Sequence, residues 1–532
     1  MTTVTPRRGR PIGGRSSPHE HCTPHPLPTP VGGALRRAAD ERCLRVPAEG
    51  ALRMSEHRSI DDEPSVFDGD DEGAGTGVVR IASVAALGGL LFGYDSAVIN
   101  GATSSIKEVY SIGEGPLGFA VASALLGAAV GAFSAGRIAD RVGRLQVMKI
   151  AAVLFLLSAV VTGIAPNLEI LVLGRVIGGF GVGIASVIAP AYIAETSPAR
   201  IRGRLGSLQQ LAIVSGIFLS LLVDWLLAET AGGADQQLWL GMEAWRWMFL
   251  CMAVPAVVYG ALVTTIPESP RFLIAQQRIP EARTVLTALL GEKNLDITID
   301  RIRSTLDTAT TPSWRDLRRP GGGIWPVVWV GLFLSIFQQA VGINVIFYYS
   351  NDLWQAVGFA ESASFGISVF TSVVNIATTL IAIALVDRIG RRPLLLIGSV
   401  GMAVSLGAMA VCFATAGTGA DGRLELTGAA GPVALVAANL FVIGFGMSWG
   451  PIVWVLLGEM FPNRIRAAGL SLAAAGQWAM NWLITVTFPA LAAFSLGFAY
   501  GLYTLFAVLS LIFVVRYVAE TKGRALEDME AS

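Results

Sequence analysis

Charged residues are scarce in this chain. They make up 15% of its 532 residues, whereas hydrophobic residues make up 53%. Soluble domains carry about 25% charged residues, so this balance predicts a membrane protein. Basic and acidic residues are equal in number, with 39 of each. A chain without a basic excess has little to attract phosphates, which argues against a nucleic-acid partner.

Residues that bind metals or perform nucleophilic chemistry are also few. The four cysteines are scattered without metal-site spacing, so we interpret them as free thiols. All four histidines precede residue 80, so proton chemistry in the apolar part must use carboxylates. A cluster of His19, His21, Cys22 and His25 would suit a metal ion, but in a tail of this composition we interpret it as incidental. No nucleophile–base set or phosphate loop appears, so we expect no enzyme, metal site or cofactor.

The first 79 residues differ in composition from the rest. They are rich in Pro, Arg, Gly and Asp and contain no hydrophobic stretch long enough for a signal peptide. We therefore predict a disordered tail over 1–79. Met54 lies within it and is a second candidate for the natural start of the chain.

Beyond this tail, apolar runs of about 20 residues recur, the length that crosses a bilayer with a hydrocarbon core of about 30 Å. The sequence therefore predicts an all-α membrane protein with twelve transmembrane helices. We place these spans at 80–101, 117–138, 146–166, 169–190, 205–228, 246–266, 324–350, 362–386, 393–416, 432–457, 467–491 and 497–518.

Basic residues concentrate in alternate connections between the spans. Arginines follow predicted spans 2, 4, 8 and 10, and further Lys and Arg residues occupy the long link between spans 6 and 7. The other connections hold little beyond Lys107 and Arg423. By the positive-inside rule, the charged connections, the link and both termini are cytoplasmic. We call this side of the protein the charged end and the other side the opposite end.

Three short sequence motifs each occur twice, in the same order. They are Asp-Arg-x-Gly-Arg (140–144 and 387–391), Glu-x-x-Pro-x-Arg-Ile-Arg (195–202 and 459–466) and a glutamate after the last span of each half (Glu268 and Glu520). Such matched motifs indicate two related halves, as in transporters built from repeats. The expected domains are the tail 1–79, an N-terminal half 80–266, a linker with short helices 267–323, a C-terminal half 324–518 and a cytoplasmic tail 519–532.

The repeated acids and bases suggest a cytoplasmic gate. They can bridge the two halves when the gate is closed and must separate when it opens, so each bridge should be weak. The alternative is that they only fix topology, which explains the arginines but not the paired acids and glycines. The predicted gate residues are Asp140, Arg144, Glu195, Arg202, Glu268, Arg271, Asp387, Arg391, Glu459, Arg466 and Glu520.

The first predicted span contains a single acid, in the run GGLLFGYDSAVING. This is Asp95, and a charge at the centre of a bilayer costs about 2.5–3.5 kcal/mol or more. Arg175 in span 4 lies at a similar depth, which predicts a buried pair that protonation of Asp95 would release. A static structural bridge is the alternative. We favour proton coupling, because a buried ion pair is a poor source of stability.

Several amide side chains also lie within the predicted spans. On a regular helix Gln338 and Asn344 would not share a face, but Gly342 between them could break the helix and turn both toward a cavity. Gly450-Pro451 would likewise interrupt span 10 before Trp454. Nearly uncharged amide sets suit a neutral, hydroxylated ligand. The set is Gln210, Gln338, Gln339, Asn344, Asn375 and Gln477, with Tyr348 and Tyr349 nearby.

Together these motifs resemble the sugar porter family of the major facilitator superfamily. The resemblance covers about 80–525 and is greatest to actinobacterial glucose permeases and bacterial xylose–proton symporters. It is carried by Gly93-Tyr-Asp95, Asp140-Arg-x-Gly-Arg144, Arg175, Pro267-Glu-Ser-Pro-Arg271, Gln338-Gln-x-x-Gly-Ile-Asn344, Trp449-Gly-Pro-x-x-Trp454 and Glu520-Thr-Lys-Gly.

The resemblance implies a monomeric transporter of the cell membrane that imports a monosaccharide with a proton by alternating access. Glucose is the first candidate, before xylose and galactose. Asp95 matches the proton-binding acid, with Arg175 tuning it, whereas Met252 stands where the xylose symporter has a second acid. The alternatives are a uniporter without proton coupling and, from another class, a sugar receptor. The matching sugar-contacting positions are Gln210, Gln338, Gln339, Asn344, Asn375, Trp454 and Gln477, with Phe92 and Tyr348 lining the cavity.

Overall fold

The computed structural model describes residues 75–197, 199–290, 295–307, 317–319, 322–418, 424–426, 428–462 and 465–521. The predicted tail, with its histidine and cysteine cluster, lies outside these residues except for 75–79. Those five residues belong to the first helix, which therefore begins at Gly75 and not at residue 80.

The first six predicted spans are all helical. The first and the sixth are each built from two consecutive helical pieces, and a short helix, α2 (Thr103–Val109), follows the first span. The elements are α1 (Gly75–Ala97) with the 3₁₀ helix η2 (Val98–Gly101), α3 (Glu114–Val142), α4 (Arg144–Gly163), α5 (Leu168–Thr196), α6 (Ala199–Ala231), and α7 (Ala244–Cys251) with α8 (Ala253–Val263).

The last six predicted spans are helical as well. A short helix, α14 (Ser350–Ala356), follows the seventh. A small antiparallel pair of two-residue strands, β1 (Gly417–Thr418) and β2 (Leu424–Glu425), adds to the predicted all-α fold. The spans are α12 (Pro326–Ala340) with α13 (Ile343–Tyr348), α15 (Glu361–Ile389), α16 (Arg391–Ala414), α17 (Ala430–Gly446) with α18 (Trp449–Met460), α19 (Arg466–Phe494) and α20 (Leu496–Tyr517).

Within the described residues, eleven spans are long and apolar enough to cross a membrane. The predicted span 467–491 is not among the eleven, although α19 covers it. The reason is chemical, because the amides Gln477 and Asn481 lie in the middle of α19 and lower its hydropathy. With α19, the helices form the twelve-helix arrangement of the major facilitator fold.

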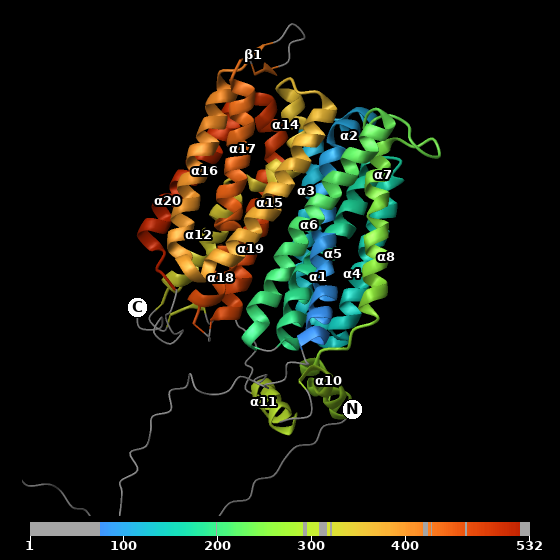
Figure 1. Ribbon diagram of the computed structural model, residues 1–532, viewed down its shortest axis with the longest axis vertical. Helices are drawn as coiled ribbons and strands as arrows, with labels where there is room; N and C mark the ends of the chain where they lie inside the picture. Colours follow the sequence, from blue (N-terminus) through green and yellow to red (C-terminus); the bar gives the residue numbers. More distant parts are fainter. Residues whose placement is uncertain are drawn as a thin grey trace, which may run out of the picture. The chain divides into compact units, whose positions relative to one another are not determined.

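The linker folds into short helices, as its amphipathic runs predict. These are α9 (Pro270–Ala275), α10 (Ile279–Leu290) and α11 (Leu295–Asp307). They share a small apolar core of their own, which includes Leu273, Leu286 and Ile299. Figure 1 shows α10 and α11 at one end of the bundle and α2, α14 and β1 at the other.

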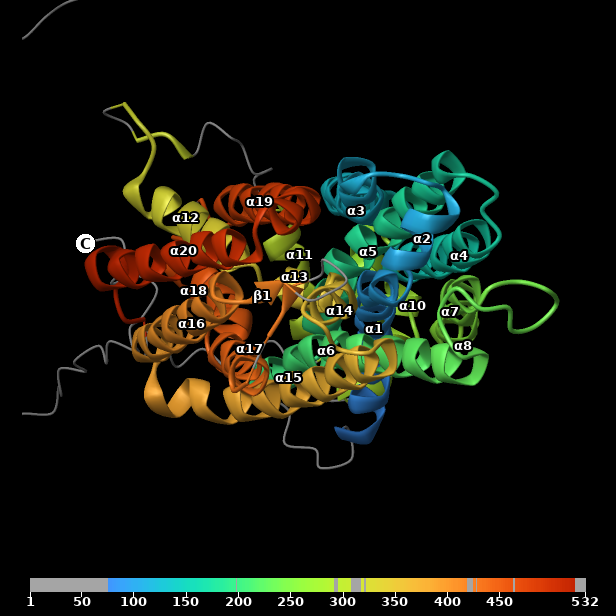
Figure 2. The same cartoon turned by 90° about the horizontal axis from the view of Figure 1, so that it is seen from above.

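The two sets of six spans lie side by side, and Figure 2 shows α3 next to α19 and α15 next to α6 where they meet. Within the first set, α3 and α5 approach each other through glycines. A Cβ on Gly179 would lie 1.9 Å from the carbonyl oxygen of Ala124. Close backbone approach through small residues is the usual basis of helix packing in membranes.

Hydrogen bonds join the two sets of spans at the opposite end. The Asn351 backbone N–H donates to Asn100 Oδ1 at 2.9 Å, and Ser104 Oγ donates to Asp352 Oδ1 at 2.7 Å. The Ala234 backbone N–H also donates to Glu361 Oε1 at 3.0 Å. The opposite end is therefore closed in this structure.

Candidate functional site

A break in the seventh span positions the predicted amides. Gly342 separates α12 from α13 and has a left-handed backbone with a φ of 80°. A Cβ at this position would also lie 2.8 Å from the ring of Tyr503. Glycine is thus required at this position for two reasons: its backbone adopts a positive φ, and a side chain would collide with the Tyr503 ring. The predicted break at Gly342 is present.

This break brings three amides of span 7 together with a fourth from α19. Asn344 Nδ2 donates to Gln339 Oε1 at 2.7 Å and to Asn481 Oδ1 at 2.8 Å. Gln339 Nε2 in turn lies 3.5 Å from Gln338 Oε1. We call Gln338, Gln339, Asn344 and Asn481 the amide cluster. Its donors and acceptors can exchange their mutual hydrogen bonds for bonds to hydroxyl groups.

The tenth span is also broken, three residues before the predicted point. The gap between α17 and α18 is Met447–Ser448, and Gly450 and Pro451 lie in the first turn of α18. Gln338 Nε2 donates to the backbone carbonyls of Trp449 at 2.8 Å and Gly450 at 3.1 Å. The start of α18 therefore anchors the amide cluster.

The other predicted sugar-contacting side chains lie on four different helices. α6 carries Gln210, α15 carries Asn375, α18 carries Trp454 and α19 carries Gln477. Within the described part of the chain, no hydrogen bond links them to the amide cluster. Their assignment stays a prediction.

Asp95 and Arg175 lie together in the interior, as the sequence predicts. Each side chain is 2% exposed, and Arg175 Nη1 lies 3.5 Å from Asp95 Oδ1. The guanidinium makes its shorter contact, 2.7 Å, with the backbone carbonyl of Asp95. Neither carboxylate oxygen of Asp95 has a hydrogen bond among the described residues. The pair is thus a charge contact that leaves both oxygens open to a proton.

A small cavity adjoins this pair. Its volume of about 10 Å³ is close to the space of one water molecule, and its polar lining is Asp95, Ser96, Arg175 and Tyr348. Tyr348 interacts with Ser96 of α1 and with Asn481 of α19. A polar path therefore runs from the Asp95–Arg175 pair in one set of spans, through Tyr348, to the amide cluster in the other.

Phe92 and Trp478 make a second contact near this path. Their ring centroids are 6.2 Å apart and join α1 to α19. Phe92 was predicted to line the cavity, whereas Trp478 was not singled out. Both lie next to predicted residues, Trp478 directly after Gln477 and Phe92 three residues before Asp95.

Sequence reasoning missed Asn481, although a signal was present. Asn481 lies four residues after Gln477 on α19 and so shares its helical face. Ser96 directly follows Asp95, but an isolated serine in a span carries no signal of its role in the sequence. A buried acid in α6, Asp224, was missed as well.

At the charged end, Arg144 organises a cluster of the first half. Its guanidinium donates to both oxygens of Glu195 at 3.0 Å. Glu268 accepts from the backbone N–H groups of Arg144 at 3.0 Å and Leu145 at 3.1 Å, and so caps the N-terminus of α4. A carboxylate at a helix N-terminus is stabilised by the exposed N–H groups. A Cβ on Gly143 would lie 2.4 Å from Glu268 Oε2, so this glycine makes room for the cap.

The second half repeats this cluster. Arg391 donates to both oxygens of Glu459, at 3.1 and 2.7 Å. Glu520 accepts from the backbone N–H groups of Arg391 at 3.1 Å and Arg392 at 3.0 Å, and so caps α16. A Cβ on Gly390 would lie 2.9 Å from Glu520 Oε2. The repeated Asp-Arg-x-Gly-Arg motif is thus explained as an arginine pair and a capped helix start.

These ion pairs lie within each half and not between the halves, where the gate hypothesis placed them. Asp140 adds an exposed contact to Arg144 at 3.3 Å, and Arg271 is exposed. Arg466 donates to the Phe461 carbonyl at 3.2 Å. The side chains of Arg202 and Asp387 lie outside the described residues.

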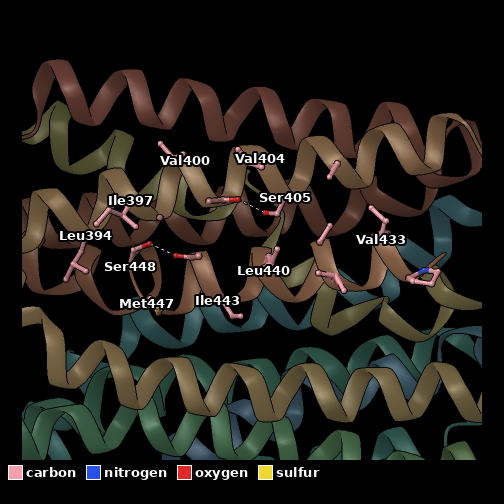
Figure 3. A pocket seen from close by; sticks show the side chains of 17 residues that line it. Leu394, Ile397, Val400, Val404, Ser405, Val433, Leu440, Ile443, Met447 and Ser448 are labelled. Atoms are coloured by element: carbon pink, nitrogen blue, oxygen red, sulfur yellow. Dashed lines mark hydrogen bonds between the residues drawn. The ribbon is translucent and has the colours of Figure 1, made fainter. Parts of the chain in front are cut away.

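A larger hollow lies away from these polar groups. Its volume is about 690 Å³, and it lies between α16 and α17 (Figure 3). Ile397, Val404 and Leu440, which line it, are each at least half exposed. The lining is almost wholly aliphatic, so it offers hydroxyl groups no set of partners and suits lipid acyl chains better than a sugar.

Comparisons with known proteins agree on one family. Residues 81–532 match the family model of sugar (and other) transporters. The glucose transport protein of Synechocystis sp. is 54% identical over 454 residues, which cover 85% of this chain and 97% of that protein. The D-xylose-proton symporter of Escherichia coli is 37% identical, with 85% and 95% covered. The glucose facilitated diffusion protein of Zymomonas mobilis is 33% identical, with 85% and 97% covered.

The solved structures agree with these relatives. The inward open conformation of the xylose transporter XylE from E. coli superposes with a TM-score of 0.72 at 37% identity, covering 85% of this chain and 99% of that one. Fold, motifs and relatives therefore coincide over nearly all of the described residues. The chain belongs to the sugar porter family of the major facilitator superfamily, whose members are integral membrane transporters and not enzymes.

Proposed function

We propose that the protein imports a monosaccharide, with glucose as the first candidate, together with a proton. The observation that carries this proposal is the polar path from the buried Asp95–Arg175 pair through Tyr348 to the amide cluster. A proton site and a hydroxyl-binding site in contact are what coupled transport requires. Relatives named as a glucose transport protein and as xylose–proton and arabinose–proton symporters support both substrates.

The sugar would bind at the amide cluster. Gln338, Gln339 and Asn344 are buried or half-buried and already hydrogen-bonded, so their positions are set before a ligand arrives. We infer that Gln210, Asn375, Trp454 and Gln477 complete the site from the neighbouring helices, with Phe92 and Tyr348 at its wall.

Asp95 would carry the proton. When ionised, it holds the charge of Arg175, and when protonated it releases that charge toward the cavity shared with Tyr348. Tyr348 touches Asn481, which bonds to Asn344. A change in the Asp95–Arg175 pair would therefore alter the hydrogen bonds that hold the sugar amides.

Transport would proceed by alternating access. The closed opposite end, with its Asn100–Asn351 and Ser104–Asp352 contacts, represents one state of this cycle. We infer that the charged end faces the cytoplasm with both termini, and that the arginine clusters there exchange partners when that end closes. The gate assignment of Asp140, Arg202, Arg271, Asp387 and Arg466 belongs to the same proposal.

We further infer a monomer in the cell membrane. One chain supplies both sets of six spans and the whole polar path, so no second copy is needed. Strongly exposed aliphatic and aromatic side chains such as Phe133, Val153 and Val404 suit contact with lipid.

The test is uptake of labelled glucose into proteoliposomes with and without an inward proton gradient. We expect the native protein to accumulate glucose above equilibrium when the gradient is present, and Asp95→Asn only to equilibrate it. Uniport is the competing function, and the facilitated diffusion protein among the relatives favours it. Equilibration alone by the native protein, with no change in Asp95→Asn, would establish uniport instead.

A further inference from the structure

A second buried acid lies near the opposite end of α6. Asp224 is seven residues before the end of this helix at Ala231, or about 10 Å along its axis. Its side chain is fully buried, with a relative exposure of 0%, and neither carboxylate oxygen has a hydrogen bond of normal geometry. An intramembrane carboxyl in this position costs several kcal/mol if charged, so a functional reason for it is expected.

Among the described residues, no cation is found against Asp224. From α1 it faces Tyr94, from α7 it faces Cys251, and from η2 it faces the backbone of Gly101. Two arginines in the interior of the first half are engaged elsewhere, Arg175 with Asp95 and Arg246 with Glu243. An isolated acid without a counter-ion avoids its charge by binding a proton.

Asp224 packs directly against the segment that closes the opposite end. A Cβ on Gly101 would lie 2.9 Å from the Asp224 Cβ and 2.7 Å from Met248 Sδ. The preceding residue, Asn100, accepts the hydrogen bond from Asn351 across the two halves. Three residues further on, Ser104 donates to Asp352. The burial of Asp224 and the closure of the opposite end thus depend on the same segment, 98–104.

This segment is also where the first span changes its helical form. α1 ends at Ala97, and η2 continues as a 3₁₀ helix over Val98–Gly101. η2 lies between α1 and α2, and a 3₁₀ stretch that interrupts a helical path often marks a hinge. Movement of η2 during opening would uncover Asp224, because Gly101 has no side chain to shield it.

We propose that Asp224 is a second proton-binding residue, sealed with its proton when the opposite end is closed and open to water when that end opens. This inference rests on the proposed alternating access. Binding of a proton at Asp224 favours closure, because a charged Asp224 cannot be sealed without a counter-ion. A lower pH on the side of the opposite end therefore promotes closure of that end over the occupied sugar site.

Hydrogen–deuterium exchange of 98–109 and 350–356, measured in lipid nanodiscs at pH 6 and pH 8, tests this. After correction for intrinsic exchange rates, we expect several-fold faster exchange in the native protein at pH 8. One proton over two pH units limits the effect to about 100-fold. Asp224→Asn mimics the protonated side chain and should exchange slowly at both values. Asp235→Asn changes an exposed acid in the loop that follows α6, and we expect it to behave as the native protein.

The proposal is overturned if the native protein shows no such pH dependence, or if Asp224→Asn keeps it. The native measurement decides the matter even if the variant fails to fold, which gel filtration would reveal. Failure of symport is a separate outcome. If the native protein shows the pH-dependent exchange but does not accumulate glucose in response to a proton gradient, the Asp224 proposal stands and the symport proposal fails.

Discussion

At the charged end, Glu268 caps α4 in one half and Glu520 caps α16 in the other. Beside each cap, an arginine donates to both carboxylate oxygens of a second glutamate. In the interior the halves do not match. The first half holds the acids Asp95 and Asp224, and the second holds the amide cluster. In the function proposed here, the proton-binding acid lies in the first half and most of the sugar-binding amides lie in the second. Coupling would then cross the contact between the halves.

The largest effect should come from the unmatched interior of the second half. Asn344→Ala removes the side chain that bonds both Gln339 and Asn481, so glucose affinity should fall by about 10- to 100-fold. Asn439→Ala is the matched control, because Asn439 is a buried amide whose one hydrogen bond among the described residues goes to the Leu435 carbonyl of its own helix. Equal loss of affinity in both variants, measured by glucose-dependent quenching of tryptophan fluorescence, would show that the amide cluster has no special role.

The break at Gly342 should give the next largest effect. Gly342→Ala forces a left-handed backbone on alanine and presses a methyl against Tyr503, at a cost of about 1–3 kcal/mol. The melting temperature should fall by several degrees. Gly366→Ala in α15 is the control, since a Cβ there meets nothing within 4 Å and should not destabilise the protein. A Gly342→Ala variant as stable as the native protein would contradict the structure at this break.

The smallest effect should come from the matched clusters. Glu195→Gln and Glu459→Gln each remove one charge from a repeated pair, and individual pairs of this kind contribute about 1 kcal/mol or less. If these glutamates exchange partners across the halves when the charged end closes, as proposed, each variant should favour opening at that end by up to about fivefold, as read from a dye pair placed there on α3 and α15. Glu281→Gln, in the exposed linker, is the control. If only one of the two variants shifted the protein toward opening, the two clusters would not be equivalent.

Much of this arrangement could be predicted because it depends on local pattern. Span lengths, the glycine break and the equal depth of Asp95 and Arg175 all follow from helix geometry. The partners of Arg144 could not be predicted, because Arg144 meets Glu195 and Glu268 through the packing of α4 against α5 and against the connection between α8 and α9. Asn481 and Asp224 were missed for a similar reason. A single polar residue in a span reveals its role only when its neighbours from other helices are known.

The most direct test of proton coupling is the pH change that glucose causes in a lightly buffered suspension of proteoliposomes. We predict that glucose added outside makes the external medium alkaline with the native protein, and that Asp95→Asn causes no such change. Identical alkalinisation by both would exclude Asp95 as the coupling residue. Equilibration of glucose by the native protein without any pH change would contradict symport itself.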